Sequence, residues 1–74
     1  MEISLFQLKN NKQAKVVDVV GGFGLRQRLE GLGIKVGSRI LKISDVSGPV
    51  VIKVKGAQLA IGRGMASKII VEEE

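Results

Sequence analysis

The chain has 74 residues, a formal net charge of +5, and neither cysteine nor histidine. Without cysteine it can form no disulfide, thiolate metal site or thiol nucleophile, and without histidine it lacks the usual proton shuttle near neutral pH. This length predicts one small domain over residues 1–74. The positive charge suits nucleic acid, a membrane surface or an acidic protein as partner, and it is also an ordinary charge for solubility.

The N-terminal stretch "MEISLFQLKNNKQ" lacks the basic start and long apolar run of a secretory signal. Apolar stretches elsewhere, such as "VVDVVGGFG", are too short to span a bilayer. We therefore expect a cytoplasmic protein.

The first predicted elements are a short turn and a strand. Ser4 precedes Leu5 and Leu8, which predicts a single helical turn capped by Ser4. The β-branched run Ala14–Val20 predicts a strand. Its four valines cannot all face one side, so we expect a β-bulge, or partial cover on both faces.

A short helix is predicted next, in "GGFGLRQRLEGLGIKVG". Leu25, Leu29 and Leu32 have the spacing of one helix face, which we expect to be buried. Gly33 can adopt the left-handed conformation that ends a helix, and Ile34 would then contact Leu29 in a Schellman-type cap. The glycines before the helix resemble a phosphate loop only superficially, because the GxxxxGK pattern followed by Ser or Thr is missing. Their backbone amides could form an anion nest, but a conformational role is the stronger interpretation.

The second half of the chain indicates strands joined by short turns. The expected strand positions are Arg39–Ser44, Val50–Val54, the inward-facing Ala57, Leu59 and Ile61, and a last strand with Ile69 and Val71. Between the first two of these strands, "SDVSGP" predicts a loop. The alternation over Val50–Val54 predicts one apolar face and one mostly basic face. Gly56 predicts a hairpin, "GRGMAS" predicts about one helical turn, and the glutamates 72–74 are expected to be solvated and frayed.

These elements favour a mainly β fold. We predict a small SH3-like antiparallel barrel of about five short strands, with one short helix between the first two strands. An OB-type barrel is the second choice, because that fold usually needs more residues.

The side chains offer little catalytic or metal chemistry. The serines have no imidazole base, and a pairing of Ser67 with the adjacent Lys68 is disfavoured because neighbouring side chains usually point apart. Metal ligands would have to come from Asp18, Asp45 or the glutamates, without a shaped loop to hold them. We expect no enzyme activity, no cofactor and no specific metal site.

Nucleic-acid binding is a stronger alternative. The cations that could form a basic face are Arg39, Lys42, Lys53 and Lys55. Single-strand binders usually stack bases on aromatic side chains, and this chain has only Phe6 and Phe23. A protein-binding surface or a purely electrostatic one therefore remains.

Three stretches resemble the FeoA family of ferrous-iron transport accessory proteins: "RQRLEGLGIKVGSRI", "GPVVIKVKGAQLAIGR" and "ASKIIV". The matching places are Arg28-Leu29, Leu32-Gly33, Gly37, Gly48-Pro49, Ala66 and Ile69–Val71. Two departures lie in turns: Val36 stands where the family often has proline, and "NNKQ" replaces a usual proline-glycine. Each piece alone is weak, but their order and spacing cover nearly the whole chain.

The resemblance implies an SH3-like barrel that acts beside the membrane iron transporter FeoB, whose cytoplasmic part binds GTP. It also implies likeness to the C-terminal domains of metal-dependent repressors of the diphtheria-toxin-repressor type. We expect partner contacts from Arg26, Arg28 and Arg63, and the equally weighted alternative for Arg26 and Arg28 is simple solvation of the helix. The alternative function is a small basic barrel that binds nucleic acid electrostatically.

Overall fold

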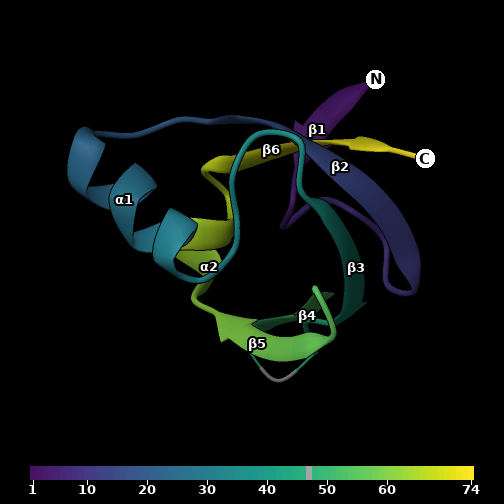
Figure 1. Cartoon of the computed structure of the whole chain (residues 1–74). Helices are drawn as coiled ribbons and strands as arrows, with labels where there is room; N and C mark the ends of the chain where they lie inside the picture. Colours follow the sequence, from purple (N-terminus) through teal and green to yellow (C-terminus); the bar gives the residue numbers. More distant parts are fainter. Residues whose placement is uncertain (47) are drawn as a thin grey trace.

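A computed structural model describes residues 1–46 and 48–74, and in these residues a curled sheet of six antiparallel strands carries two short helices (Figure 1). The elements in chain order are β1 (Glu2–Ser4), β2 (Lys12–Val19), α1 (Phe23–Gly31), β3 (Arg39–Ser44), β4 (Val50–Val54), β5 (Ala57–Ile61), α2 (Arg63–Ala66) and β6 (Ile69–Glu73). The strand order across the sheet is β1-β6-β2-β3-β4-β5. The two termini therefore lie close together, as Figure 1 shows.

The predicted mainly β, SH3-like fold class is confirmed, with more elements than expected. The N-terminal residues Glu2–Ser4 form a sixth strand because they pair with β6, and the helical turn predicted for "GRGMAS" is confirmed as α2. The predicted helix therefore lies between β2 and β3. The loop prediction for "SDVSGP" includes Ser47, which lies outside the described residues.

The predicted bulge is present in β2. Val16 pairs with Val71 and Asp18 pairs with the preceding Ile70, so Val17 is the extra residue. The bulge turns Val16 and Val19 both into the core. It also increases the local twist that lets so short a sheet curl around its own apolar face.

The C-terminus of α1 has the predicted Schellman cap. Gly33 has φ +87°, and its amide donates to the carbonyl of Glu30 at 2.9 Å. The amide of Ile34 donates to the carbonyl of Leu29 at 2.9 Å, and both side chains are buried. This cap fixes the direction in which the chain leaves the helix.

The prediction that three leucines form one buried face of α1 is wrong for Leu32. Leu29 is fully buried in the core cluster and Leu25 is partly buried against it, but Leu32 is 44% exposed. The helix ends at Gly31, and Leu32 is the C-cap with φ −92° and ψ 0°. Its side chain therefore leaves the helical face and turns toward solvent.

Lys42 does not belong to a basic face, contrary to the sequence prediction. It is 1% exposed, and its ammonium group donates to the carbonyls of Phe6 and Leu8 at 2.8 and 2.6 Å and to Oδ2 of Asp45 at 2.9 Å. An ammonium group has three donors, so all three are used. Burial of this charge is tolerated because every proton has an acceptor.

Lys42 thereby completes the predicted N-terminal turn. Ser4 and Gln7 form a capping box, in which each side-chain oxygen accepts from the other residue's amide, at 3.2 and 3.0 Å. The following carbonyls of Phe6 and Leu8 lie where a helical turn leaves its acceptors unpaired. Lys42, 34 to 36 residues further along the chain, satisfies both of them.

The C-terminal glutamates are paired rather than frayed, which corrects the sequence prediction. Glu72 and Glu73 lie in β6 beside β2, and the amide of Glu74 donates to the carbonyl of Gln13 at 3.0 Å. Their carboxylates also meet cations, at 4.0 Å from Glu73 to Lys12 and 3.4 Å from Glu74 to Arg39. The tail is held because β2 is long enough to pair with all of β6.

The inward face predicted for β5 is only partly correct. Ile61 is buried and Leu59 is half-buried, but Ala57 is exposed. β5 is an edge strand with a neighbour on one side only, so the core covers just its C-terminal end. The hairpin at Gly56 is confirmed, with positive φ at Lys55 (52°) and Gly56 (80°).

Leu29→Ala should unfold most of the protein. Truncation of a fully buried leucine costs roughly 2–5 kcal/mol, and a domain of this size has only about 3–5 kcal/mol in total. Leu32→Ala, on the same helix but exposed, should stay within about 0.5 kcal/mol of wild type. Thermal unfolding followed by circular dichroism checks both, and a sharp wild-type transition in Leu29→Ala would show that α1 does not close the core.

Lys42→Met should destabilise the domain by about 1–3 kcal/mol, because the carbonyls of Phe6 and Leu8 lose their donor. Lys53→Met removes an exposed lysine from the neighbouring strand and should leave stability nearly unchanged. Urea unfolding of both variants measures the difference. Equal stability of the two variants would mean that the ammonium group contributes nothing to the fold.

Candidate protein-interaction surface on helix α1

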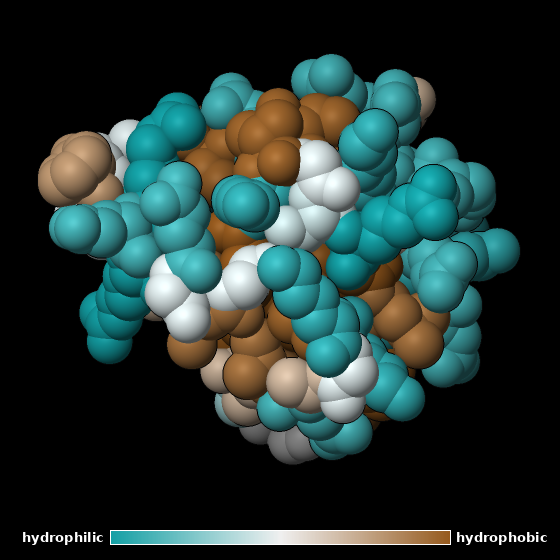
Figure 2. All heavy atoms as spheres, in the orientation of Figure 1, coloured by the Kyte–Doolittle hydropathy of each residue, from teal (hydrophilic) through white to brown (hydrophobic). Residues whose placement is uncertain are grey.

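Exposed apolar side chains concentrate on α1 and the loops at its two ends, residues 20–36, which we call the α1 surface. Of the described residues, six large hydrophobic side chains are exposed, and four of them lie here. They are Val20 (55%), Phe23 (78%), Leu32 (44%) and Val36 (58%). Figure 2 shows hydrophobic surface above the loop between α1 and β3. Such a concentration is typical of an interaction site, whereas scattered apolar residues need no explanation.

A pocket of about 210 Å³ opens in this surface between α1, the end of β2 and the loop before β3. The buried Val19 and Ile34 form its base, and the exposed Val36 lines it together with the charged Arg26, Glu30 and Lys35. This combination resembles the small anchor pockets of protein interfaces, in which one inserted side chain is surrounded by polar groups.

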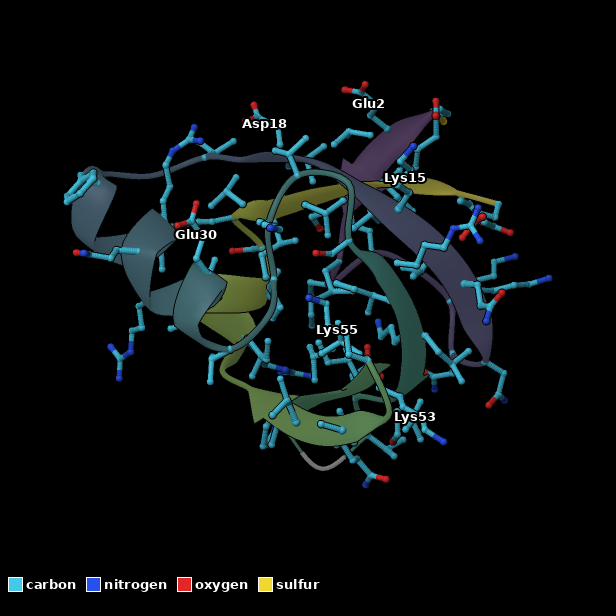
Figure 3. The ribbon with its side chains drawn as sticks, viewed as in Figure 1. Glu2, Lys15, Asp18, Glu30, Lys53 and Lys55 are labelled. Atoms are coloured by element: carbon cyan, nitrogen blue, oxygen red, sulfur yellow. The ribbon has the colours of Figure 1, made fainter. Side chains whose placement is uncertain are left out.

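Arg26 lies at the rim of this pocket and forms a surface ion pair. Its guanidinium nitrogen Nη2 is 3.5 Å from Oδ1 of Asp18, and both side chains are about half exposed. Figure 3 shows Asp18 and Glu30 on this side of the molecule. An exposed pair of this kind contributes about 0–1 kcal/mol, so Arg26 can exchange Asp18 for a partner's carboxylate at little cost.

The loop that forms the other rim is held firmly to β2. The Ser38 hydroxyl donates to the carbonyl of Gly33 and accepts from the amide of Lys35, both at 3.1 Å. Gly37 and Ser38 also exchange backbone hydrogen bonds with Val16, at 2.8 Å each. Val36 is therefore presented on a pre-ordered loop, which lowers the entropy cost of binding.

The structure does not gather the three predicted arginines. Arg26 lies at the pocket, but Arg28 is two residues further along the helix and so points about 200° away around the helix axis. Arg63 begins α2, where its guanidinium lies 5.1 Å from the centre of the Phe6 ring. Arg28 forms no ion pair with any described residue.

Sequence reasoning missed two features of the surface. The sequence predicts a strand at Val20 and a turn at Val36, and the only signal of their exposure is the weak one of a valine beside a glycine. The ring of Phe6 lies between two cations, Lys42 at 5.7 Å and Arg63 at 5.1 Å. Cation–π contacts of this kind join segments that are far apart in sequence, so no local pattern predicts them.

Within residues 1–46 and 48–74, no group of three or more acidic side chains is arranged to hold a metal ion. Among the same residues, no helix is long and apolar enough to cross a lipid bilayer.

Comparison with known proteins decides the family. The family model described as the FeoA domain matches residues 3–73, almost the full chain. The chain belongs to the FeoA family. Membership places it among the accessory proteins of Fe(2+) transport, and it confirms the resemblance seen in the sequence.

Individual relatives agree with this assignment. The FeoA chain is 43% identical over 65 residues to a protein of Methanocaldococcus jannaschii named "Putative Fe(2+) transport protein A", covering 88% of this chain and 79% of that protein. A crystal structure of an iron uptake regulatory protein (FeoA) superposes with a TM-score of 0.93 at 31% identity, covering 100% of this chain and 99% of the other.

The same fold also occurs inside larger chains. The crystal structure of ScaR with bound Zn2+ matches the FeoA chain with a TM-score of 0.87 and 26% identity. The match covers 97% of this chain but only 37% of the ScaR chain.

Proposed function

We propose that this FeoA-family protein is a cytoplasmic accessory protein of ferrous-iron uptake. It acts by binding the GTP-binding cytoplasmic part of a FeoB-type membrane transporter. The transporter supplies nucleotide hydrolysis and the path for iron. We assign neither role to this chain, since its sequence lacks the GxxxxGK phosphate-loop pattern.

The α1 surface is the proposed contact, and the observation that carries it is a pocket lined by Arg26 and the exposed Val36, in the segment that holds four of the six exposed large hydrophobic side chains among the described residues. Burial of these apolar side chains against a partner would remove their surface from water, which favours binding. The partner surface would need an apolar side chain to enter the pocket and an acidic side chain to meet Arg26.

The three arginines then have different roles. Arg26 makes the direct contact because it lies at the pocket rim and its present partner is weakly bound. Arg28 and Arg63 lie outside the pocket and contribute to long-range attraction of an acidic partner, which changes association rate more than affinity.

The alternative of electrostatic nucleic-acid binding loses support from the fold. Lys42 is buried in the core and cannot contact a phosphate backbone. The remaining cations of the predicted basic face, Arg39, Lys53 and Lys55, line one groove, and neither phenylalanine is among the residues that line it.

Titration of the transporter's purified cytoplasmic domain with this protein tests the proposal. Arg26→Gln and Val36→Ser should each weaken binding by about five- to twentyfold, the usual effect of removing an interface contact of about 1–2 kcal/mol. Arg28→Gln removes the same charge from the same helix outside the pocket and should change affinity by less than about twofold.

Calorimetry at physiological salt, with circular dichroism to confirm folding of each variant, provides the measurement. Equal effects of Arg26→Gln and Arg28→Gln would show that charge alone attracts the partner and that the pocket is not the contact. Absence of binding by the wild-type protein, together with tight binding to random DNA or RNA, would replace the proposed function by the nucleic-acid alternative.

A further inference from the structure

A second groove lies between β2, β3 and β4, and two of its three cations form no ion pair with any described residue. It has a volume of about 340 Å³ and is lined by Gln13, Arg39, Ile40, Leu41, Lys53, Lys55 and Gly56. Figure 3 shows Lys53 and Lys55 on the side of the molecule formed by β4 and β5, away from Asp18. Of the described residues, none forms an ion pair with Lys53 or Lys55.

The third cation of the groove already holds a carboxylate. Nε of Arg39 is 3.4 Å from Oε2 of Glu74, in a pair whose arginine side chain is 76% exposed. Solvent screens such a pair strongly, so a competing carboxylate can replace Glu74. The groove therefore combines two free ammonium groups with one guanidinium whose acidic partner is exchangeable.

The cations are positioned rather than loosely extended. Lys53 on β4 pairs with Leu41 on β3, and Arg39 lies two residues before Leu41 on β3. The sheet therefore sets the spacing between Lys53 and Arg39. Lys55 follows at the hairpin turn, and its stem packs against the end of α1, where a Cβ on Gly33 would lie 3.8 Å from its Cδ. Leu41 is half-buried, lines the same groove and supplies its apolar floor.

We propose that this groove, lined by Arg39, Lys53 and Lys55, binds an acidic peptide segment of a partner protein, whose carboxylates displace Glu74. The carboxylates would pair with the three cations, and an apolar side chain would cover Leu41. Glu74 then competes with the peptide for Arg39, so anions that bind Arg39 more weakly than Glu74 does are excluded from it. The proposal stands independently of the α1 surface and of the transporter.

A peptide fits this groove better than nucleic acid or an anionic membrane. None of the side chains that line the groove is aromatic, so bases would have no platform on which to stack. The acidic residues of β6 lie beside β2, next to the groove, and would repel an extended phosphate backbone or a flat anionic bilayer. A short peptide covers less of this acidic edge than a nucleic-acid backbone or a bilayer does.

Fluorescence anisotropy with a fluorescein-labelled glutamate-rich peptide that has one central leucine tests the proposal. Arg39→Gln and Lys53→Gln should each weaken binding by about two- to fivefold, the range for exposed charge contacts. Glu74→Gln should strengthen it by about two- to fivefold, because the internal competitor is lost. Arg28→Gln, an equal loss of charge on α1, should leave the affinity unchanged.

A peptide with glutamines in place of the glutamates, single-stranded DNA of random sequence, and phosphatidylcholine vesicles containing phosphatidylserine are the comparison ligands. Weaker binding of all three supports an acidic-peptide groove. Tighter binding of DNA or vesicles than of the acidic peptide would overturn the proposal. So would equal weakening by Arg28→Gln and Lys53→Gln, or no effect of Glu74→Gln. None of these results depends on transporter binding, so each proposal can fail without the other.

Discussion

The buried ammonium group of Lys42 is the interaction on which the arrangement of the chain depends. It reaches from the middle of the sheet to two carbonyls of the N-terminal turn and to Asp45 just after β3. The turn carries Leu5 and Leu8 into the core, and β1 before it pairs with β6. One side chain therefore links the N-terminal turn to the centre of the sheet, in a domain too small to rely on apolar burial alone.

The sequence predicted the features that local chemistry controls. The valine-rich run predicted a bulge or partial cover on both faces, and β2 has the bulge; Leu29 and Gly33 defined the buried position and end of the helix, and alternation located β4 to the residue. It failed where distant segments decide the outcome. The acceptors of Lys42 lie 34 to 36 residues away, and the edge strand β1 forms only because β6 is beside it. Leu32 was misplaced because the helix stops one residue before it.

For the candidate sites too, the sequence predicted local features and missed those that distant segments create. The sequence correctly placed Arg26 on a short helix, but the pocket beside it also needs Val19 from β2 and Ile34 and Val36 from the loop before β3. Likewise, three cations predicted for a basic face do line one groove, whereas the fourth, Lys42, is in the core. The result is a domain with two unlike surfaces: one around α1 that combines exposed apolar side chains with charges of both signs, and a basic one over β2, β3 and β4. Both surfaces suit the proposed role of contacting partner proteins.

The central functional claim is that a FeoB-type transporter meets this protein at the α1 surface. Amide chemical-shift mapping of the isotopically labelled protein, on addition of the transporter's cytoplasmic domain, tests it most directly. The account predicts that the largest shifts fall at Val20, Arg26 and Val36, and that the β4–β5 hairpin turn at Gly56 stays nearly unchanged. Shifts centred on the hairpin and the basic groove, with none along α1, would contradict it.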